Sequence, residues 1–178
     1  MTPATLRELI NRYYQIGARD LHGLDLQGLD LAAAHLAEAD LRRTNLTRAN
    51  LHRANLNHID GYQLILAQAD LRSASLANAV LREADLHKAN CHRTTLINAD
   101  LRESRLDHAD LSHADLEGAN LTQADLSHAN LYWANLRHAN LTGANLAGAN
   151  LVGAKFCQTR MPDGTMRDSN CPLLPNGV

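Results

Sequence analysis

The sequence predicts an all-β solenoid, a chain that winds into a stack of short coils around a leucine core. Two observations carry this prediction. Leucine fills 25 of the 28 positions that recur at every fifth residue from 21 to 156, and Gly61, Cys91 and Phe156 fill the other three. A small residue, usually alanine, stands two residues before each of these central positions, and Asp or Asn commonly stands one residue before it.

A period of five residues fits neither regular secondary structure. Five residues turn an α-helix by about 140°, so the leucines would spread around its surface. On a flat strand, an odd period would send successive leucines to opposite faces. All the leucines are buried only if the chain bends toward one axis after every pentapeptide and its coils stack like strands, about 4.8 Å apart.

The positions of aspartate favour four pentapeptides per coil. Like charges that stack directly on each other are destabilising, so the correct coil length should stack few Asp pairs. Among the Asp residues that precede central positions, a coil of 15 residues stacks five pairs and a coil of 25 residues stacks three. A coil of 20 residues stacks only two pairs, Asp20 with Asp40 and Asp40 with Asp60.

The pattern resembles that of the pentapeptide-repeat proteins, whose repeat is A(D/N)LXX. Residues 109–113 (Ala-Asp-Leu-Ser-His) and 139–143 (Ala-Asn-Leu-Thr-Gly) are examples, and the resemblance covers residues 21–156. It implies a right-handed quadrilateral β-helix, here of about seven coils and about 34 Å long at the strand spacing.

The segment before the repeat, residues 1–20, is expected to form an N-terminal helical cap. Thr2 suits the N-cap, Pro3 the first helical position and Gly17 the position after the last turn. Apolar residues then form one stripe at helical spacing, and they are Leu6, Leu9, Ile10 and Tyr13. The open end of a solenoid needs such a cover, although an amphipathic helix that binds a partner is the alternative.

The repeat contains one conspicuous defect, at Gly61. Ile59 and Leu64 replace the usual alanines on either side of it, and the spacing of the leucines is unchanged. We therefore predict a compensated exchange of core volume rather than a loop. Tyr62 is expected to project outward between Arg42 and Arg82, within reach of cation–π contact.

The end of the repeat and the segment 157–178 are expected to form a C-terminal cap. From 130 to 150 every residue before a central position is Asn, and stacked Asn side chains can form a hydrogen-bonded ladder. Pro162-Asp163-Gly164 is a turn signal and predicts a short hairpin over the last coil. Cys157 and Cys171 lie on either side of this hairpin and could come within disulfide range, although a cytosolic location favours free thiols, so the sequence leaves their pairing open.

One face of a four-sided coil is unusual and is the candidate binding site. We call it the basic-aromatic face, and it consists of His52, Arg53, Arg72, His92, Arg93, His113, Tyr132 and Trp133. Basic side chains beside an aromatic platform could bind an anionic partner or stack a nucleobase. The alternative is a solvated face, partly neutralised by Asp70 and Asp110.

The ten histidines and three cysteines do not indicate a metal site. His108 and His128 should lie one coil apart with Asp107 beside the first, but a metal needs further ligands. Most of the other histidines occupy outward positions that vary freely. Cys91 replaces a central leucine and should behave as a small apolar core residue.

Composition excludes several classes of protein. The net charge of −2 indicates neither a nucleic-acid binder nor a strongly acidic mimic of nucleic acid. No apolar run approaches the roughly 20 residues of a membrane span. Since no signal peptide is evident, a cytoplasmic location is expected. A core filled by leucine leaves no pocket or catalytic group, so we expect no enzyme, no cofactor and no metal.

Three functions remain for such a rod. The first is a non-enzymatic structural or protein-interaction solenoid, a monomer or a weak homodimer, whose partner is another protein. The second is implied by the resemblance, since some pentapeptide-repeat proteins mimic DNA and modulate DNA gyrase. That role requires a strongly acidic rod. The third is weak binding of nucleic acid or another anion through the basic-aromatic face, for which nucleic acid is the less expected ligand.

Overall fold

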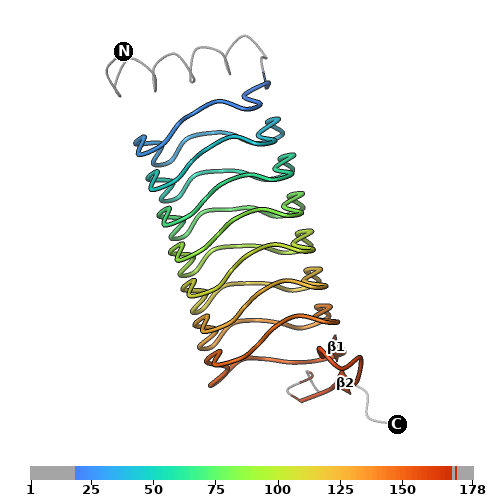
Figure 1. Ribbon diagram of the computed structural model, residues 1–178. Coiled ribbons are helices and arrows are strands. Elements are labelled where there is room, and N and C mark those ends of the chain that lie inside the picture. Colours follow the sequence, from blue (N-terminus) through green and yellow to red (C-terminus); the bar gives the residue numbers. More distant parts are fainter. Residues whose placement is uncertain (1–18, 170, 172–178) are drawn as a thin grey trace, which may run out of the picture.

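The chain forms a rod of stacked four-sided coils. The computed structural model describes residues 19–169 and 171, and Figure 1 shows the coils following one another along the rod. Every isolated β-bridge is parallel and joins residues 20 apart, from Asp20 with Asp40 to Asn140 with Arg160. The predicted four-sided coil is therefore confirmed, including both stacked aspartate pairs.

Leucine and alanine fill the interior of the rod. All central residues from Leu21 to Leu141 are buried, as is Phe156, and the alanines two positions earlier are buried beside them. Each buried leucine stabilises the fold by about 1.5–3 kcal/mol before conformational entropy is subtracted. The core is thus one continuous column of aliphatic side chains, which needs almost no aromatic residues.

Residues 126–130 show how a regular pentapeptide in the middle of the rod satisfies all five of its backbone N–H groups. The central residue and the second residue after it donate to the next coil, and the residue before it donates to the previous coil. The fourth amide closes a turn on the carbonyl of the central residue, and the fifth donates to the Asp or Asn side chain. In residues 126–130 the acceptors are, in chain order, Asn145 O, Asp125 Oδ1, Ala147 O, Leu126 O and Ala109 O.

The Asp or Asn before each central residue therefore has a local structural role. From Asp20 to Asn150, every Asp or Asn at this position accepts the amide N–H two residues later through Oδ1, at 2.9–3.4 Å. This Asx-type turn bends the chain at each corner. It holds the two residues after the central position outward, in columns with one member per coil.

The predicted ladder of amide side chains is also present. Asn130 Nδ2 donates to Asp110 at 3.0 Å, and Asn150 Nδ2 donates to Asn130 at 3.1 Å. In each rung the donor lies one coil closer to the C-terminus than the acceptor. Where an Asn stacks on an Asp, a hydrogen bond therefore takes the place of the repulsion that two stacked Asp side chains would have.

The defect at Gly61 is a compensated exchange of volume, as predicted. Ile59 and Leu64 are completely buried. A Cβ atom at Gly61 would lie 3.1 Å from Leu64 Cδ2 and 3.0 Å from Leu81 Cδ2, so neighbouring side chains already occupy the space. The coil keeps its register, because Gly61 N still donates to Val80 O at 2.7 Å.

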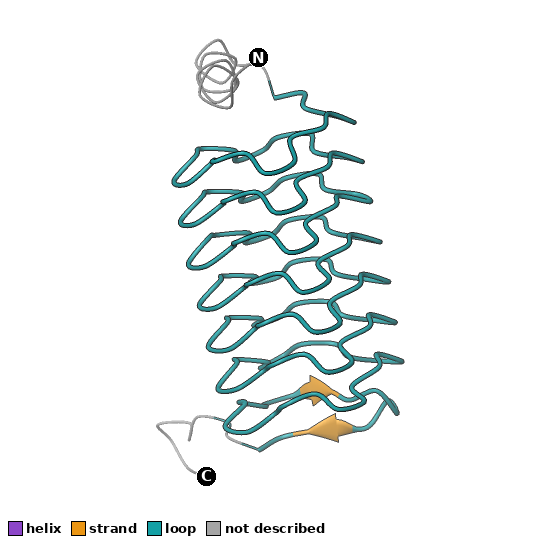
Figure 2. Ribbon diagram, turned by 60° about the vertical axis from the view of Figure 1, so that its left-hand side comes forward, coloured by secondary structure: helices purple, strands orange, loops and turns teal. Residues whose placement is uncertain are grey.

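A hairpin follows the last central residue, at the predicted place. Strand β1 (Thr159–Arg160) pairs with β2 (Met166–Arg167) in an antiparallel register, and Figure 2 shows both strands at the end of the rod. Arg160 also continues the solenoid wall, because its amide donates to Ala139 O at 3.0 Å. The Arg167 guanidinium lies 3.9 Å from the centre of the buried Phe156 ring.

A disulfide joins Cys157 to Cys171, with Cα atoms 4.7 Å apart. The sequence left this pairing open. The bond ties the chain after β2 back to the last turn of the solenoid.

The hairpin covers only part of the last coil. Within the described residues, the amides of Leu146, Gly148, Leu151 and Gly153 donate no hydrogen bond, although the matching amides one coil earlier all do. Leu146 and Leu151 are only half-buried, and Val152 is 66% exposed. In the part of the chain that the structure describes, no segment pairs with this strand edge.

The expected helix of residues 1–20 lies almost entirely outside the described residues, so it stays a prediction. The division into residues 1–20, 21–156 and 157–178 also stays a prediction. No helix in the described part of the chain is long and apolar enough to cross a bilayer.

Candidate functional site

The structure brings the eight residues of the basic-aromatic face together on consecutive coils. Each pair of coils is joined by a backbone hydrogen bond between members of this face or their turn neighbours, such as Arg53 N to Arg72 O at 3.0 Å. Arg93 N donates to Ser112 O at 3.0 Å, and His113 N donates to Tyr132 O at 2.8 Å. The face therefore exists as a surface, while its binding role stays a prediction.

Two columns of side chains make up this face, because each turn contributes two outward residues. The column of second turn residues contains Arg53, Ser73, Arg93, His113 and Trp133, all exposed. These residues share a left-handed backbone, with φ between 55° and 58°. Since one backbone conformation repeats in every coil, the column runs along the rod without a change of direction.

The aromatic end of the face is a chain of ring contacts. The His113 ring lies edge-on to both His92, at 5.5 Å between centroids, and Tyr132, at 5.7 Å. Tyr132 in turn contacts Trp133 at 6.3 Å. Edge-to-face contacts of this kind hold the rings in defined orientations.

Trp133 ends the column and is half exposed, at 49%. Its indole lies against the backbone of the next coil, where a Cβ atom at Gly153 would come within 2.7 Å of Nε1. Gly153 also has a φ of +73°. Only glycine therefore combines this backbone with the close approach of the ring.

Arg72 differs from the other two arginines of the face because it is neutralised. Its Nε lies 2.8 Å from Asp70 Oδ1, and its Nη2 lies 2.6 Å from Asp70 Oδ2. The hydrogen bond from Arg72 lowers the pKa of Asp70. Partial neutralisation by Asp70 was one of the two expectations from the sequence, and it applies to Arg72.

Arg53 and Arg93 differ from Arg72 in their surroundings. Within residues 19–169 and 171, no carboxylate forms an ion pair with either guanidinium. Asp110, the other acid expected to neutralise the face, instead accepts the Ser112 amide at 3.0 Å and Asn130 Nδ2 at 3.0 Å. The two exposed arginines and the aromatic end therefore set the character of the surface.

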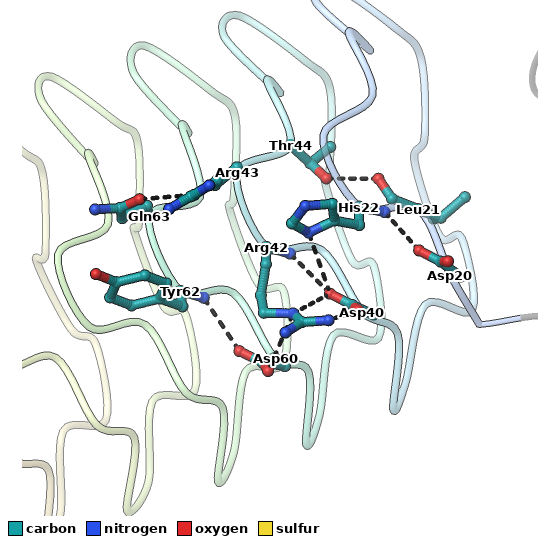
Figure 3. A network of polar contacts seen from close by, with 10 residues as sticks. All are labelled: Asp20, Leu21, His22, Asp40, Arg42, Arg43, Thr44, Asp60, Tyr62 and Gln63. Carbon is teal, nitrogen blue, oxygen red and sulfur yellow. Dashed lines mark hydrogen bonds and ion pairs between the residues drawn. The ribbon is translucent and has the colours of Figure 1, made fainter.

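A second polar network lies near the N-terminal end of the rod (Figure 3). Arg42 binds Asp40 with two guanidinium nitrogens, and its Nε lies 3.5 Å from Asp60 Oδ2. His22 Nδ1 lies 3.9 Å from the same Asp40. The hydrogen bond from Arg42 lowers the pKa of Asp40, so the two stacked aspartate pairs are offset by a shared cation.

Tyr62 joins this network through its backbone amide, which donates to Asp60 Oδ1 at 3.3 Å. Among the described residues, its ring makes no cation–π contact with Arg42 or Arg82, contrary to the expectation. The hydroxyl donates to Glu83 Oε1 at 3.1 Å, and this bond raises the pKa of Tyr62. Gln63 Nε2 donates to Glu83 Oε2 at 2.8 Å, and Gln63 Oε1 accepts from Arg43 Nε at 3.0 Å. Arg43, Gln63 and Glu83 form a ladder along one column.

The histidine face does not form a ligand set around Asp107. His108 and His128 stack with centroids 5.0 Å apart and planes 11° apart. Asp107 instead contacts His87 and Arg105. Its Oδ2 lies 2.6 Å from His87 Nδ1, and its Oδ1 lies 2.7 Å from Arg105 Nε. In the part of the chain that the structure describes, no group of three or more His, Cys, Asp or Glu is arranged to hold a metal ion.

Cys91 is a core residue, as predicted from its central position. It is fully buried, and burial raises the pKa of its thiol to about 12. A buried, protonated thiol is a poor nucleophile, so Cys91 has a packing role.

The pattern of repeats matches a known family model, described as pentapeptide repeats, in eight copies. The matched segments are residues 20–60, 65–102, 85–123, 104–143 and 124–163. The chain belongs to the pentapeptide-repeat family. The right-handed quadrilateral β-helix of this family accounts for the four-sided coil and the buried leucine column.

Several solved structures of this family are similar to the chain. HetL, a pentapeptide-repeat protein involved in heterocyst differentiation regulation from the cyanobacterium Nostoc sp. strain PCC 7120, is 32% identical. The match covers 89% of this chain and 98% of HetL, with a TM-score of 0.35. A pentapeptide-repeat protein from the cyanobacterium Cyanothece 51142 is also 32% identical, over 85% of this chain and 97% of its own, with a TM-score of 0.32.

QnrB1, a plasmid-mediated fluoroquinolone resistance protein, is more distant, at 21% identity. The match covers 78% of this chain and 79% of QnrB1, with a TM-score of 0.48. Among curated proteins, none is similar enough in sequence to count as a relative. Because every one of these TM-scores is below 0.5, the family assignment rests on the repeat model and on sequence identity.

Proposed function

We propose that this protein is a non-enzymatic interaction solenoid of about seven coils that binds another protein through the basic-aromatic face. The observation that supports the proposal is the column of Arg53, Arg93 and Trp133. Both guanidiniums are exposed, and neither forms an ion pair with a described carboxylate, while the indole is 49% exposed. Arginine and tryptophan are the residues that most often dominate binding energy at protein interfaces.

The rigidity of the rod supports the same proposal. Every outward side chain of this face starts from a corner whose backbone is bonded to the coils above and below it. Such a scaffold leaves little backbone to be ordered on binding, which favours affinity. Repeat proteins commonly bind partners through the extended surface that their stacked repeats create.

Affinity capture from native cell extract tests the proposal. The bait is the wild-type chain, and the test variant is Arg53→Ala/Arg72→Ala/Arg93→Ala. Arg48→Ala/Lys88→Ala is a matched control, because Arg48 and Lys88 hold the same turn position, also two coils apart, on the neighbouring face. We expect a partner protein that the wild type and the control retain and the triple variant loses. A partner retained equally by all three would move the interface to another surface.

Modulation of DNA gyrase is the second candidate, and the charges on the rod disfavour it. A mimic of DNA requires an uninterrupted acidic surface, whereas Asp40, Asp70 and Asp100 are each paired with an arginine two residues later. The net charge is only −2. A supercoiling assay with gyrase and excess protein tests this candidate. Inhibition or protection of gyrase would make gyrase modulation the favoured function.

Location in the cytoplasm and a monomeric or weakly dimeric state are further parts of the proposal. The near-neutral, mixed-charge surface agrees with both, whereas the disulfide between Cys157 and Cys171 disfavours a reducing compartment. Fractionation of cells that make the protein, together with sedimentation of the purified chain, checks both.

A further inference from the structure

The spacing of charge on the basic-aromatic face defines the chemistry of its partner. Arg53 and Arg93 lie in one column and are separated by two coils, and Arg93 and Trp133 are separated by two more. At about 4.8 Å per coil, each interval is about 10 Å. A peptide in the polyproline II conformation rises about 3.1 Å per residue with three residues per turn, so three of its residues span each interval and every third side chain points to the same side.

We propose that the column binds an acidic peptide segment in the polyproline II conformation that runs along the rod axis. The segment carries two carboxylates three residues apart and an apolar residue three residues further on. The first carboxylate pairs with Arg53, the second pairs with Arg93, and the apolar side chain lies on the Trp133 indole. This inference rests on the proposed function, because it specifies the partner of the same face.

The residues between the anchors fit such a segment. Ser73, between the two arginines, is small and exposed, so it leaves room for a backbone to pass. His113, between Arg93 and Trp133, is fixed by edge-on contacts to His92 and Tyr132. The rings therefore form an ordered apolar platform at one end of the column, and the charges lie at the other end.

A nucleic acid fits the same column less well. Its phosphates would place charge continuously along the face, whereas the unpaired cations are spaced two coils apart. Asp70 and Asp110 line the same face, and each is held in place by hydrogen bonds of its own. A polyanion would meet both carboxylates, while a peptide with separated charges meets only the arginines.

Trp133 provides a local probe for the experiment, because it is the only tryptophan in the chain. Its fluorescence would be followed during titration with the synthetic peptide acetyl-Glu-Gly-Ser-Glu-Gly-Ser-Leu-amide at low ionic strength. A reordered peptide with adjacent acids, acetyl-Glu-Glu-Gly-Ser-Gly-Ser-Leu-amide, has the same composition and charge. Oligothymidylate is the nucleic-acid probe.

We expect the spaced peptide to shift the Trp133 emission and to bind about tenfold more tightly than the reordered one. The variant Arg53→Glu/Arg93→Glu should lose this binding. The control Arg48→Glu/Lys88→Glu makes the same charge change at the same turn positions on the neighbouring face and should retain it. Thermal unfolding of each variant confirms that the rod is intact.

Equal binding of both peptides, or binding that survives Arg53→Glu/Arg93→Glu, would overturn the inference. So would preferential binding of oligothymidylate. Absence of peptide binding, combined with a captured protein that depends on the three arginines, would reject only the acidic-peptide partner. A captured protein that is indifferent to those arginines would reject the proposed function itself.

Discussion

Leu64 occupies the space beside Gly61 that a central leucine fills elsewhere in the rod. A Cβ atom at Gly61 would lie only 3.1 Å from Leu64 Cδ2. Two departures from the repeat therefore cancel each other inside one coil. Neither residue alone follows the pattern, but together they conserve the volume of the core.

The variants Gly61→Leu, Leu64→Ala and their combination test this compensation. Gly61→Leu overpacks the coil and should cost about 1–3 kcal/mol, and Leu64→Ala leaves a cavity and should cost about 2–5 kcal/mol. The double variant removes the conflict with Leu64, although Ile59 still replaces an alanine, and it should be more stable than either single variant in a urea unfolding series. Additive costs would show that the two sites do not share one space.

Val80 stands where most coils carry Asp or Asn, and it cannot accept the amide of Arg82. Val80 is also 38% exposed, so its side chain gains little from burial. Val80→Asn should supply the missing acceptor and stabilise the rod by about 0.5–1.5 kcal/mol. Chemical denaturation measures the change. Val80→Leu is the control, and a loss of stability in Val80→Asn would contradict the role assigned to this position.

Because of Asp107, the free energy of unfolding of the rod should decrease at acid pH. Burial raises the pKa of this carboxyl, but the hydrogen bonds from His87 and Arg105 outweigh burial and lower it. The contribution of Asp107 is thus complete above the pKa of an unfolded aspartate, about 3.9, and is lost as the pH falls through the lower folded value. Urea unfolding between pH 2 and pH 6 should show wild type and Asp107→Asn converging at low pH. A constant difference over the whole range would contradict the shift.

The open edge at the end of the rod should be visible in amide hydrogen exchange. The amides of Leu146, Gly148, Leu151 and Gly153 should exchange rapidly, because they donate no hydrogen bond within the described part of the chain. The matched amides one coil earlier donate to the next coil at 2.8–3.0 Å and should be protected; they belong to Leu126, His128, Leu131 and Trp133. Equal protection of both sets would mean that another segment or molecule covers this edge.

The sequence predicts the architecture well because one physical requirement repeats along most of the chain. A leucine at every fifth residue is buried only in a coil that turns at every pentapeptide, and two stacked aspartate pairs are enough to favour four sides. The same logic finds the exchange at Gly61, since its compensating residues lie in adjacent repeats. The hairpin at residues 157–171 follows from a local turn signal.

The sequence does not show which outward side chains form ion pairs or hydrogen bonds with each other. Unlike the buried leucines, the outward positions share no requirement on residue type. Arg72 and Arg93 occupy neighbouring coils of one face, yet only Arg72 follows an Asp by two residues and pairs with it. The same spacing precedes Arg42 and Arg102, so this signal was present in the sequence. The Asx turns could also be predicted from the sequence, because Asp and Asn side chains commonly accept the amide two residues later. The stacking of Asn residues between coils predicts only the ladder of amide side chains.

Photo-crosslinking in cells tests most directly the claim that one face of four contacts a partner protein. A photoreactive benzoylphenylalanine would replace Ser73, which lies between Arg53 and Arg93 and leaves both arginines in place. The control site is Asn78, an exposed residue on the next face with the same φ of 57°.

We expect a protein to be crosslinked from position 73 and not from position 78, and the crosslink to disappear in the Arg53→Glu/Arg93→Glu background. A crosslink of equal strength from both positions, or from position 78 alone, would contradict the assignment of the basic-aromatic face as the interaction surface.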